Sequence, residues 1–180
     1  MANMVDYVKE HTETIAEDGF NDSDGLVLAE LAYLKWEYLL EMSDEELANK
    51  GIPYTQQQLI DLVGKGGSGM SLQDLVGYLM MTDYYTSLYQ SYLTGGLDDD
   101  SRKKDEIALM LAIQSSDRFR DMTISNIYYV SVTRDEVDTL EDLEQFAAVT
   151  FTYQSEDGHH KYVAFRGTDG TLEGWCEDFN

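Results

Sequence analysis

The residues with the clearest chemical potential lie near the end of the sequence, where a short apolar run leads into Arg166-Gly167-Thr168-Asp169. The run, Lys161–Arg166, is rich in residues that favour strands, so the pattern predicts a strand that ends in a tight turn. A threonine at such an end can present its hydroxyl and its backbone N–H at a sheet edge. In acyl transfer, fixed donors of this kind stabilise the developing carbonyl oxyanion by ~3–4 kcal/mol each.

A plainer interpretation of the same residues stays open. Gly167 lets the backbone turn without a Cβ clash, so the segment can be an ordinary Gly-Thr-Asp turn with Arg166 in an ion pair. Asp169 places a carboxylate beside the proposed anion site, which is unfavourable unless the side chain points away. It can instead cap a helix that begins near Thr171, or hold the loop through a hydrogen bond.

No residue of the sequence is predicted to be an activated nucleophile. A serine hydrolase of the α/β type needs Gly-x-Ser-x-Gly between a strand and a helix. The nearest match is Gly66-Gly67-Ser68-Gly69-Met70, which has methionine in the last position and follows a predicted helix. We therefore interpret Ser68 as a loop serine. Cys176, the single cysteine, has no nearby base in the sequence and is interpreted as a structural thiol.

Three further patterns are formal matches that the surrounding sequence argues against. His159 and His160 follow an Asp-Gly turn, so we expect an exposed hairpin rather than a catalytic triad. The glycines of the segment 64–69 fit a dinucleotide fingerprint, but a helix precedes them where a strand is needed. Asp22 and Asp24 hint at a calcium loop, but Phe20 fills its first ligand position and Leu31 its last. We predict neither a cofactor nor a metal site.

The elements that must position these groups fall into two parts. Residues 1–120 are predicted to be mainly helical, with capping boxes at Ser43 and Thr55, a longer helix from Ser71, and a further helix over Lys103–Ser116. The segment 64–69 is predicted to be a flexible break. Tyr78, Tyr84, Tyr85, Tyr89 and Tyr92 recur in the helix that begins at Ser71, where they can form a ligand-binding face or a core face with phenol tips in water.

Residues 121–180 are predicted to hold strands and the turn described above. Ile127–Val132, Phe146–Tyr153 and Lys161–Arg166 are rich in β-forming residues, and Asp157-Gly158 marks a turn. We expect the last two segments to pair antiparallel across that turn. The segment Thr171–Phe179 is expected to form a short helix. Together the 180 residues fit a single domain of the α/β class.

The composition limits the partners. Lys and Arg number 12 and Asp and Glu 35, which gives a net charge of −23. Nucleic acids and anionic membranes require a positive protein surface, so we predict neither as a partner. No apolar run is long enough to span a bilayer, and Met1–Glu10 lacks the pattern of a secretory signal. A cytoplasmic location is the resulting expectation, and the oligomeric state is left open.

The motif and its flanking residues resemble a known family. Arg166-Gly167-Thr168 is similar to the strand-end motif of class 3 lipases, which have the α/β-hydrolase fold. The chain also resembles the Mbeg1-like family, through Trp175, Asp178 and an N-terminal block. This block is Phe20-Asn21-Asp22-Ser23-Asp24-Gly25-Leu26-Val27-Leu28, followed by Leu31-Ala32-Tyr33. The resemblance implies an N-terminal helical layer followed by the first strands of an α/β-hydrolase sheet, incomplete in this chain.

The resemblance also implies roles for residues. Thr168 corresponds to the oxyanion-hole residue. The residues implied to support the loop that carries Thr168 are Arg166, Gly167, Asp169, Trp175 and Asp178. The family's nucleophile follows this strand, beyond Asn180. The implied function is the N-terminal part of a lipase- or esterase-like serine hydrolase acting on a small-molecule or lipid ester, inactive as it stands. The alternative is a non-catalytic binding or interaction module derived from that fold.

Overall fold

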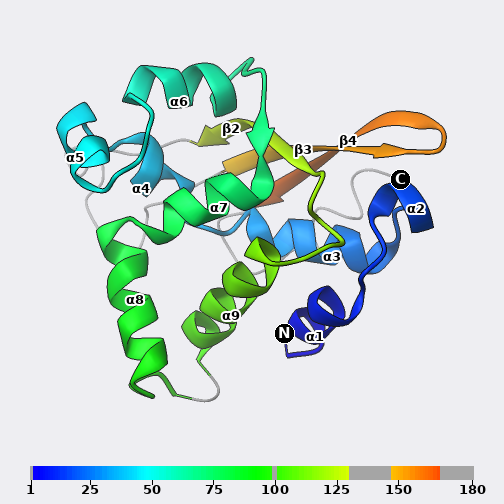
Figure 1. Ribbon diagram of the computed structural model, residues 1–180, viewed down its shortest axis with the longest axis horizontal. Coiled ribbons are helices and arrows are strands. Elements are labelled where there is room, and N and C mark those ends of the chain that lie inside the picture. Colours follow the sequence, from blue (N-terminus) through cyan, green and yellow to red (C-terminus); the bar gives the residue numbers. More distant parts are fainter. Residues whose placement is uncertain (1, 99–100, 130–146, 167–180) are drawn as a thin grey trace, which may run out of the picture.

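Helices and one antiparallel sheet make up the part of the chain that the computed structural model describes, residues 2–98, 101–129 and 147–166 (Figure 1). The mixed helix-and-strand class predicted from the sequence is therefore observed. The helices are α1 (Ala2–Glu10), α2 (Ile15–Asp18), α3 (Asp22–Leu31), α4 (Trp36–Leu40), α5 (Asp44–Asn49), α6 (Gln56–Val63), α7 (Leu72–Met80), α8 (Asp83–Leu93) and α9 (Arg102–Gln114). Helices α2, α3, α6 and α7 contact the strands, and α1, α8 and α9 pack against other helices.

Side-chain caps set where several helices begin. Thr55 accepts from the backbone N–H of Gln58, whose side chain returns to Thr55, so the predicted capping box is complete. Ser43 accepts from the N–H of Glu46, but the structure gives only this half of the predicted box. These caps replace hydrogen bonds that the first turn of a helix cannot make internally.

The prediction of one long helix from Ser71 through the tyrosines is wrong. The helix ends at Met80, and a new one begins after Thr82, whose backbone is extended and whose hydroxyl donates to the carbonyl of Leu79 at 2.7 Å. Thr82 therefore separates α7 from α8. A threonine that bonds a preceding carbonyl and then leaves the helical region provides a clear stop.

The core interpretation of the tyrosines holds for Tyr85, which is fully buried. Its hydroxyl donates to Glu106 Oε1 at 2.6 Å and accepts from the backbone N–H of Lys35 at 2.9 Å. The residue thus ties α8 to α9 and to the start of α4. Burial raises the pKa of both the Tyr85 phenol and the Glu106 carboxyl.

The sheet has the order β1-β2-β3-β4 with antiparallel neighbours. The strands are β1 (Met70–Ser71), β2 (Thr123–Tyr129), β3 (Ala147–Ser155) and β4 (Gly158–Arg166). The predicted pairing of Phe146–Tyr153 with Lys161–Arg166 is confirmed within the described residues, and both strands extend to the turn at Gly158. Gly158 has φ +118°, a conformation that glycine adopts without a Cβ clash.

The segment 64–69, predicted as a flexible break, makes specific contacts. The backbone N–H of Gly66 donates to Asn126 Oδ1 at 2.6 Å, and that of Gly69 donates to the carbonyl of Leu62 at 2.7 Å. Asn126 lies where the register between β2 and β3 shifts. The loop is therefore attached to an irregularity in the sheet.

The core lies between the helices and the inner face of the sheet. Side chains alternate along each strand, so Ile124, Val149 and Phe151 point inward and are fully buried. They join the buried leucines of α3 and α7 in one hydrophobic cluster. This packing fixes the positions of the strands, and it therefore also fixes where the strands end.

Candidate functional site

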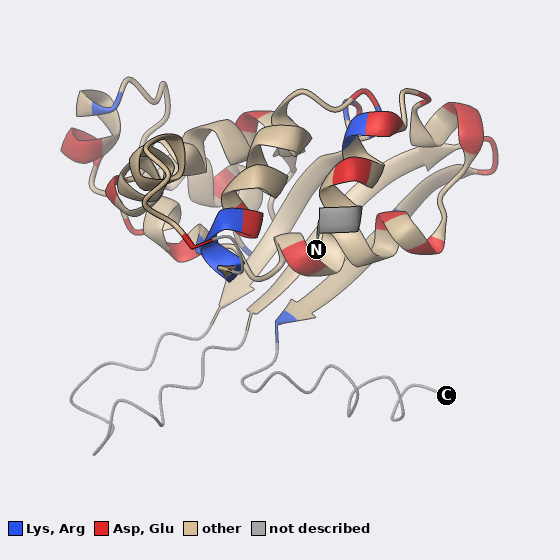
Figure 2. Cartoon of the chain, turned by 90° about the horizontal axis from the view of Figure 1, so that it is seen from below, with Lys and Arg blue, Asp and Glu red and all other residues tan. Residues whose placement is uncertain are grey.

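The strand that carries the predicted motif ends beside the ends of two other strands. Arg166, the last residue of β4, lies opposite Ala147 in β3, and Ala147 lies opposite Tyr129, the last residue of β2. The three residues therefore form a row where these strands end. Figure 2 shows the neighbouring strands of the sheet ending together on this side. Alternation along the strands turns their side chains to the inner face.

Arg166 forms a buried ion pair at this edge. Its Nη2 lies 3.8 Å from Oε1 of Glu37 in α4, and the exposed fractions of the two side chains are 7% and 10%. The ion pair that the plainer interpretation required is thus present. Charged groups this far from water are fixed in position, because leaving one of them alone would cost several kcal/mol, about 3–5 in comparable cases.

Glu37 has a further property that matters for chemistry. Its Oε1 is buried and has no hydrogen-bond partner. The contact with Arg166 is within ion-pair range but longer than a hydrogen bond. A carboxylate oxygen in this state can accept a hydrogen bond from a group that approaches the strand end.

Tyr129, at the other end of the row, is held by the same helix. Burial, a hydrogen bond to Glu41 and the negative charges of Glu41 and Glu37 together raise the pKa of its phenol to about 12. Tyr129 is therefore a protonated donor at neutral pH. Glu37 lies in α4 and Glu41 is the C-cap residue of that helix, about one turn later, so α4 and its cap position both ends of the row.

Most of the predicted site residues lie outside the described residues. This applies to Gly167, Thr168, Asp169, Trp175 and Asp178, and also to Cys176 and the helix expected over Thr171–Phe179. Arg166 is the predicted site residue whose surroundings are described. The roles of the others stay predictions.

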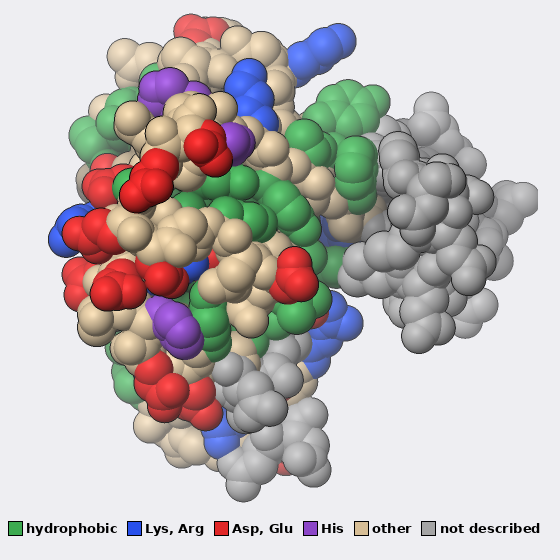
Figure 3. Space-filling model, turned by 90° about the vertical axis from the view of Figure 1, so that its right-hand side faces the viewer, with side chains coloured by type: hydrophobic (Ala, Val, Ile, Leu, Met, Phe, Trp, Pro, Cys, Tyr) green, Lys and Arg blue, Asp and Glu red, His purple; other side chains and the backbone are tan. Residues whose placement is uncertain are grey.

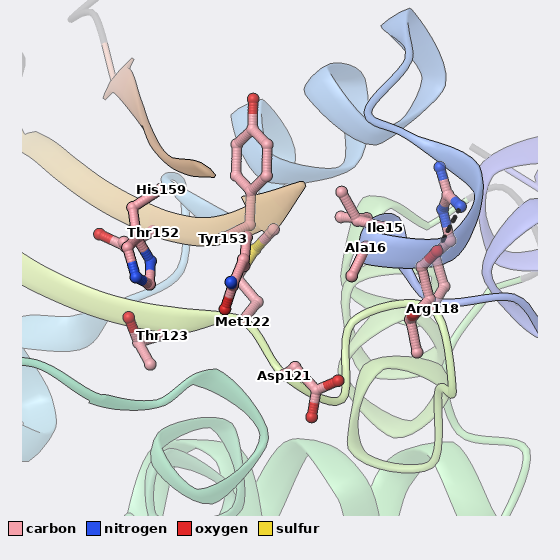
Figure 4. Close-up of a pocket in the computed structure, with 11 residues that line it drawn as sticks. Ile15, Ala16, Arg118, Asp121, Met122, Thr123, Thr152, Tyr153 and His159 are labelled. Atoms are coloured by element: carbon pink, nitrogen blue, oxygen red, sulfur yellow. Dashed lines mark hydrogen bonds between the residues drawn. The ribbon is translucent and has the colours of Figure 1, made fainter. Parts of the chain in front are cut away.

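A pocket lies at the opposite end of the sheet, between α2 and the adjoining ends of β2 and β3 (Figure 4). It has a volume of about 300 Å³, and its lining includes Ile15, Met122, Tyr153 and His159. Arg118 also lines it, but its side chain has no exposed surface. The Arg118 guanidinium is therefore not available to a ligand in this pocket.

Arg118 is part of a buried network that connects the two halves of the sequence. Its Nε and Nη2 donate to the two carboxylate oxygens of Asp24 at 3.0 and 2.6 Å, and Nη2 also donates to the carbonyl of Gly19 at 2.6 Å. Asp24 in turn accepts from the hydroxyl of Tyr7 and from the backbone N–H of Asn21. The network is structural, and it occupies the aspartate that the calcium-loop pattern had singled out.

The structure brings together one serine–histidine pair that the sequence analysis missed. Ser155 Oγ and His160 Nε2 lie 2.7 Å apart across the β3–β4 hairpin. The described part of the chain gives the His160 ring no carboxylate partner, so the pair lacks the acid of a triad. The hairpin register could have predicted this contact, because a two-residue turn after Ser155 brings His160 close to Ser155 on the neighbouring strand.

The described residues hold neither a metal-binding cluster nor a membrane-spanning helix. No group of three or more His, Cys, Asp or Glu side chains there could hold a metal ion. None of the helices described is long and apolar enough to cross a membrane.

The family model described as Mbeg1-like matches residues 113–180, a range that covers β2 to β4 and the Arg166-Gly167-Thr168-Asp169 motif. The Phe20–Tyr33 block lies outside the matched range. No curated protein and no solved structure matches the chain.

Proposed function

We propose, because residues 113–180 identify the chain as Mbeg1-like, that it supplies the oxyanion-hole strand end of a lipase- or esterase-like hydrolase acting on carboxylic esters. In this proposal Thr168 donates to the carbonyl oxygen of the ester as negative charge develops on it. The sequence contains no Gly-x-Ser-x-Gly segment, so the nucleophile is an additional component.

The observation that carries the proposal is the Mbeg1-like match, which covers the Arg166-Gly167-Thr168 motif. The buried pair between Arg166 and Glu37 fits the plainer turn as well, and it adds a physical reason for a fixed strand end. An oxyanion hole works when its donors are held in place before the reaction begins. Arg166 lies two residues before Thr168, and the pair anchors that end of β4 to α4. A rigid anchor immediately before a Gly-Thr turn supports a role in positioning donors.

The chemistry assigned to this edge is electrostatic. Attack on the ester carbonyl gives a tetrahedral intermediate whose oxygen carries a full negative charge. The N–H and hydroxyl of Thr168 would donate to that oxygen, while Gly167 lets the backbone approach it closely. Glu37 acts through Arg166 as a positioning residue.

The test substitutes Thr168 in a longer protein that includes this chain and also supplies the nucleophile. Thr168→Val keeps the side-chain shape and removes the hydroxyl, so turnover should fall by ~10²–10³ while substrate binding changes little. Thr168→Ser keeps the hydroxyl and should retain much of the rate. Thermal melting of each variant is the control for folding. Parent-like turnover by a folded Thr168→Val protein would show that Thr168 is only a turn residue.

A genetic observation separates this proposal from the interaction-module alternative. A reading frame that continues past Asn180 into a strand and Gly-x-Ser-x-Gly would support the hydrolase. A stop codon at that point would favour a binding module derived from the same fold.

A further inference from the structure

A second cavity, distinct from the pocket beside α2, lies between α4, α5 and the start of α8, whose ribbons are neighbours in Figure 1. Its volume is about 420 Å³. One of its lining residues is Glu41, the carboxylate that also accepts from Tyr129 at the end of β2. The cavity therefore adjoins the end of the sheet at which Tyr129 lies.

Two aromatic rings form part of its wall. The ring centroids of Tyr38 and Tyr84 are 5.3 Å apart with an interplanar angle of 61°. Tyr84 also packs edge-on against the fully buried Tyr85, with centroids 4.9 Å apart. Tyr84 is thus backed by the core, whereas Tyr38 is 41% exposed. Ring faces held in this way attract cations through their quadrupoles.

The charged side chains of the wall are mainly acidic. Glu41, Glu46 and Asp83 contribute carboxylates, and Lys50 contributes one ammonium group, which forms an ion pair with Asp83. Lys50 and Asp83 offset each other, so the charges of Glu41 and Glu46 dominate. An anionic ligand would be repelled here, and an uncharged acyl chain would have to displace water from two carboxylates.

We propose that this cavity binds an organic cation of the quaternary ammonium class, with the ammonium group between the tyrosine rings and the carboxylates of Glu41 and Glu46. Quaternary ammonium groups are weakly hydrated and suit aromatic walls, and acidic neighbours add a Coulombic attraction. The inference concerns binding and holds whether or not the ester chemistry does.

A third cavity serves as an internal control. It lies between α7, α8 and α9, has a volume of about 620 Å³, and is also lined by tyrosine and methionine, with Tyr78 and Tyr89 among its residues. Its wall holds only one carboxylate, that of Asp74. If aromatic surface alone attracted the ligand, the two cavities would compete equally.

The experiment titrates the 180-residue chain with choline and, separately, with 3,3-dimethyl-1-butanol, its uncharged isostere. Amide chemical shifts are followed by NMR in 150 mM NaCl, which screens diffuse attraction to the acidic surface. We expect saturable choline shifts at Thr82 to Tyr84 and at least tenfold weaker binding of the isostere. Equal binding of both probes, no binding of either, or shifts spread over the acidic surface would overturn the proposal.

Variants test the ring and the charge separately. Tyr84→Leu should weaken choline binding about three- to thirtyfold, the range for loss of one cation–π contact, and Tyr84→Phe should retain it. Glu46→Gln should weaken choline binding without changing that of the isostere. Tyr89→Leu, in the control cavity, should leave choline binding unchanged. Choline affinity that is unaffected by Tyr84→Leu in a folded protein would also overturn the assignment.

Discussion

At the scale of single residues, the most constrained group in the described structure is the Arg118 guanidinium. It has no exposed surface, and it joins α2 and the cap of α3 to the turn that follows α9. Asp24, its main partner, is equally buried. The hydrogen bond to Asp24 and the negative charges around it raise the pKa of Arg118 further, although burial opposes them.

Replacing Arg118 should therefore destabilise the protein strongly. Arg118→Met leaves the Asp24 carboxylate buried without its cation, so we expect the free energy of unfolding to fall by about 3–5 kcal/mol. Urea denaturation measures the change. The matched control is Arg120→Met, since Arg120 is exposed and its ion pairs with Asp117 and Asp121 are at 3.7 and 3.8 Å, so the loss should be below about 1 kcal/mol. Similar losses for the two variants would contradict this view.

Some residue roles could be predicted from the sequence, and their partners could not. An ion pair for Arg166 was one interpretation of the motif, but the sequence holds 35 acidic residues and no pattern selects Glu37 among them. Ion-pair partners are chosen by packing between elements that are remote in sequence. The same holds for Ser155 and His160, whose approach depends on the register of a hairpin.

At the scale of elements, local signals were reliable where they act within a few residues. The Thr55 cap formed as expected, and the hairpin turn lies at Glu156-Asp157, one residue before the predicted Asp157-Gly158. Contacts with other elements decided the rest. The segment 64–69 has the composition of a flexible loop, yet the loop bonds to Asn126, the non-glycine residue with positive φ (+48°) in the described chain.

At Asn126 we expect the stability order of the glycine and alanine variants to be the reverse of the usual order in a strand. Asn126→Gly loses the hydrogen bond to Gly66 but keeps the left-handed conformation, whereas Asn126→Ala loses both. We expect Asn126→Ala to be less stable than Asn126→Gly by about 1 kcal/mol. At ordinary strand positions glycine is the less stable of the two. Chemical denaturation of both variants measures their free energies of unfolding. A more stable Asn126→Ala would show that the backbone at this position leaves the left-handed conformation at little cost.

The contact between α4 and β2 predicts a dependence of stability on alkaline pH. The pKa of Tyr129 is about 12 in the folded protein and ~10 in an unfolded chain, so folding favours the protonated phenol. The stabilisation is complete below pH ~10 and is lost as the pH rises through about 12. Unfolding free energies measured from pH 9 to 12 should therefore fall less steeply for Tyr129→Phe than for the parent. Parallel curves would exclude Tyr129 as a contributor, because the other tyrosines are common to both proteins.

At the scale of the whole molecule, the two ends of the sheet carry different side chains. One end joins Arg166 and Tyr129 to the acidic side chains of α4, and the other carries the hairpin with Ser155 and His160. On the face that includes this hairpin, the histidines lie among many acidic side chains (Figure 3). Eight residue steps along β3 separate Ser155 from Ala147, the residue opposite Arg166, a distance of roughly 27 Å. The Ser155–His160 pair therefore cannot attack an ester held by donors at the Arg166 end.

This separation predicts that the 180-residue chain alone does not turn over esters. Ser68 lies exposed in the loop after α6, and the described residues give Ser155 a histidine but give that histidine no acid to orient it. Incubation with p-nitrophenyl acetate and butyrate should give only the background rate, and a fluorophosphonate probe should label neither serine. Ser68→Ala and Ser155→Ala identify the site if labelling occurs. Robust labelling that disappears in Ser155→Ala would show that the hairpin pair is an activated nucleophile, and the reaction centre would then lie at the opposite end of the sheet from Arg166.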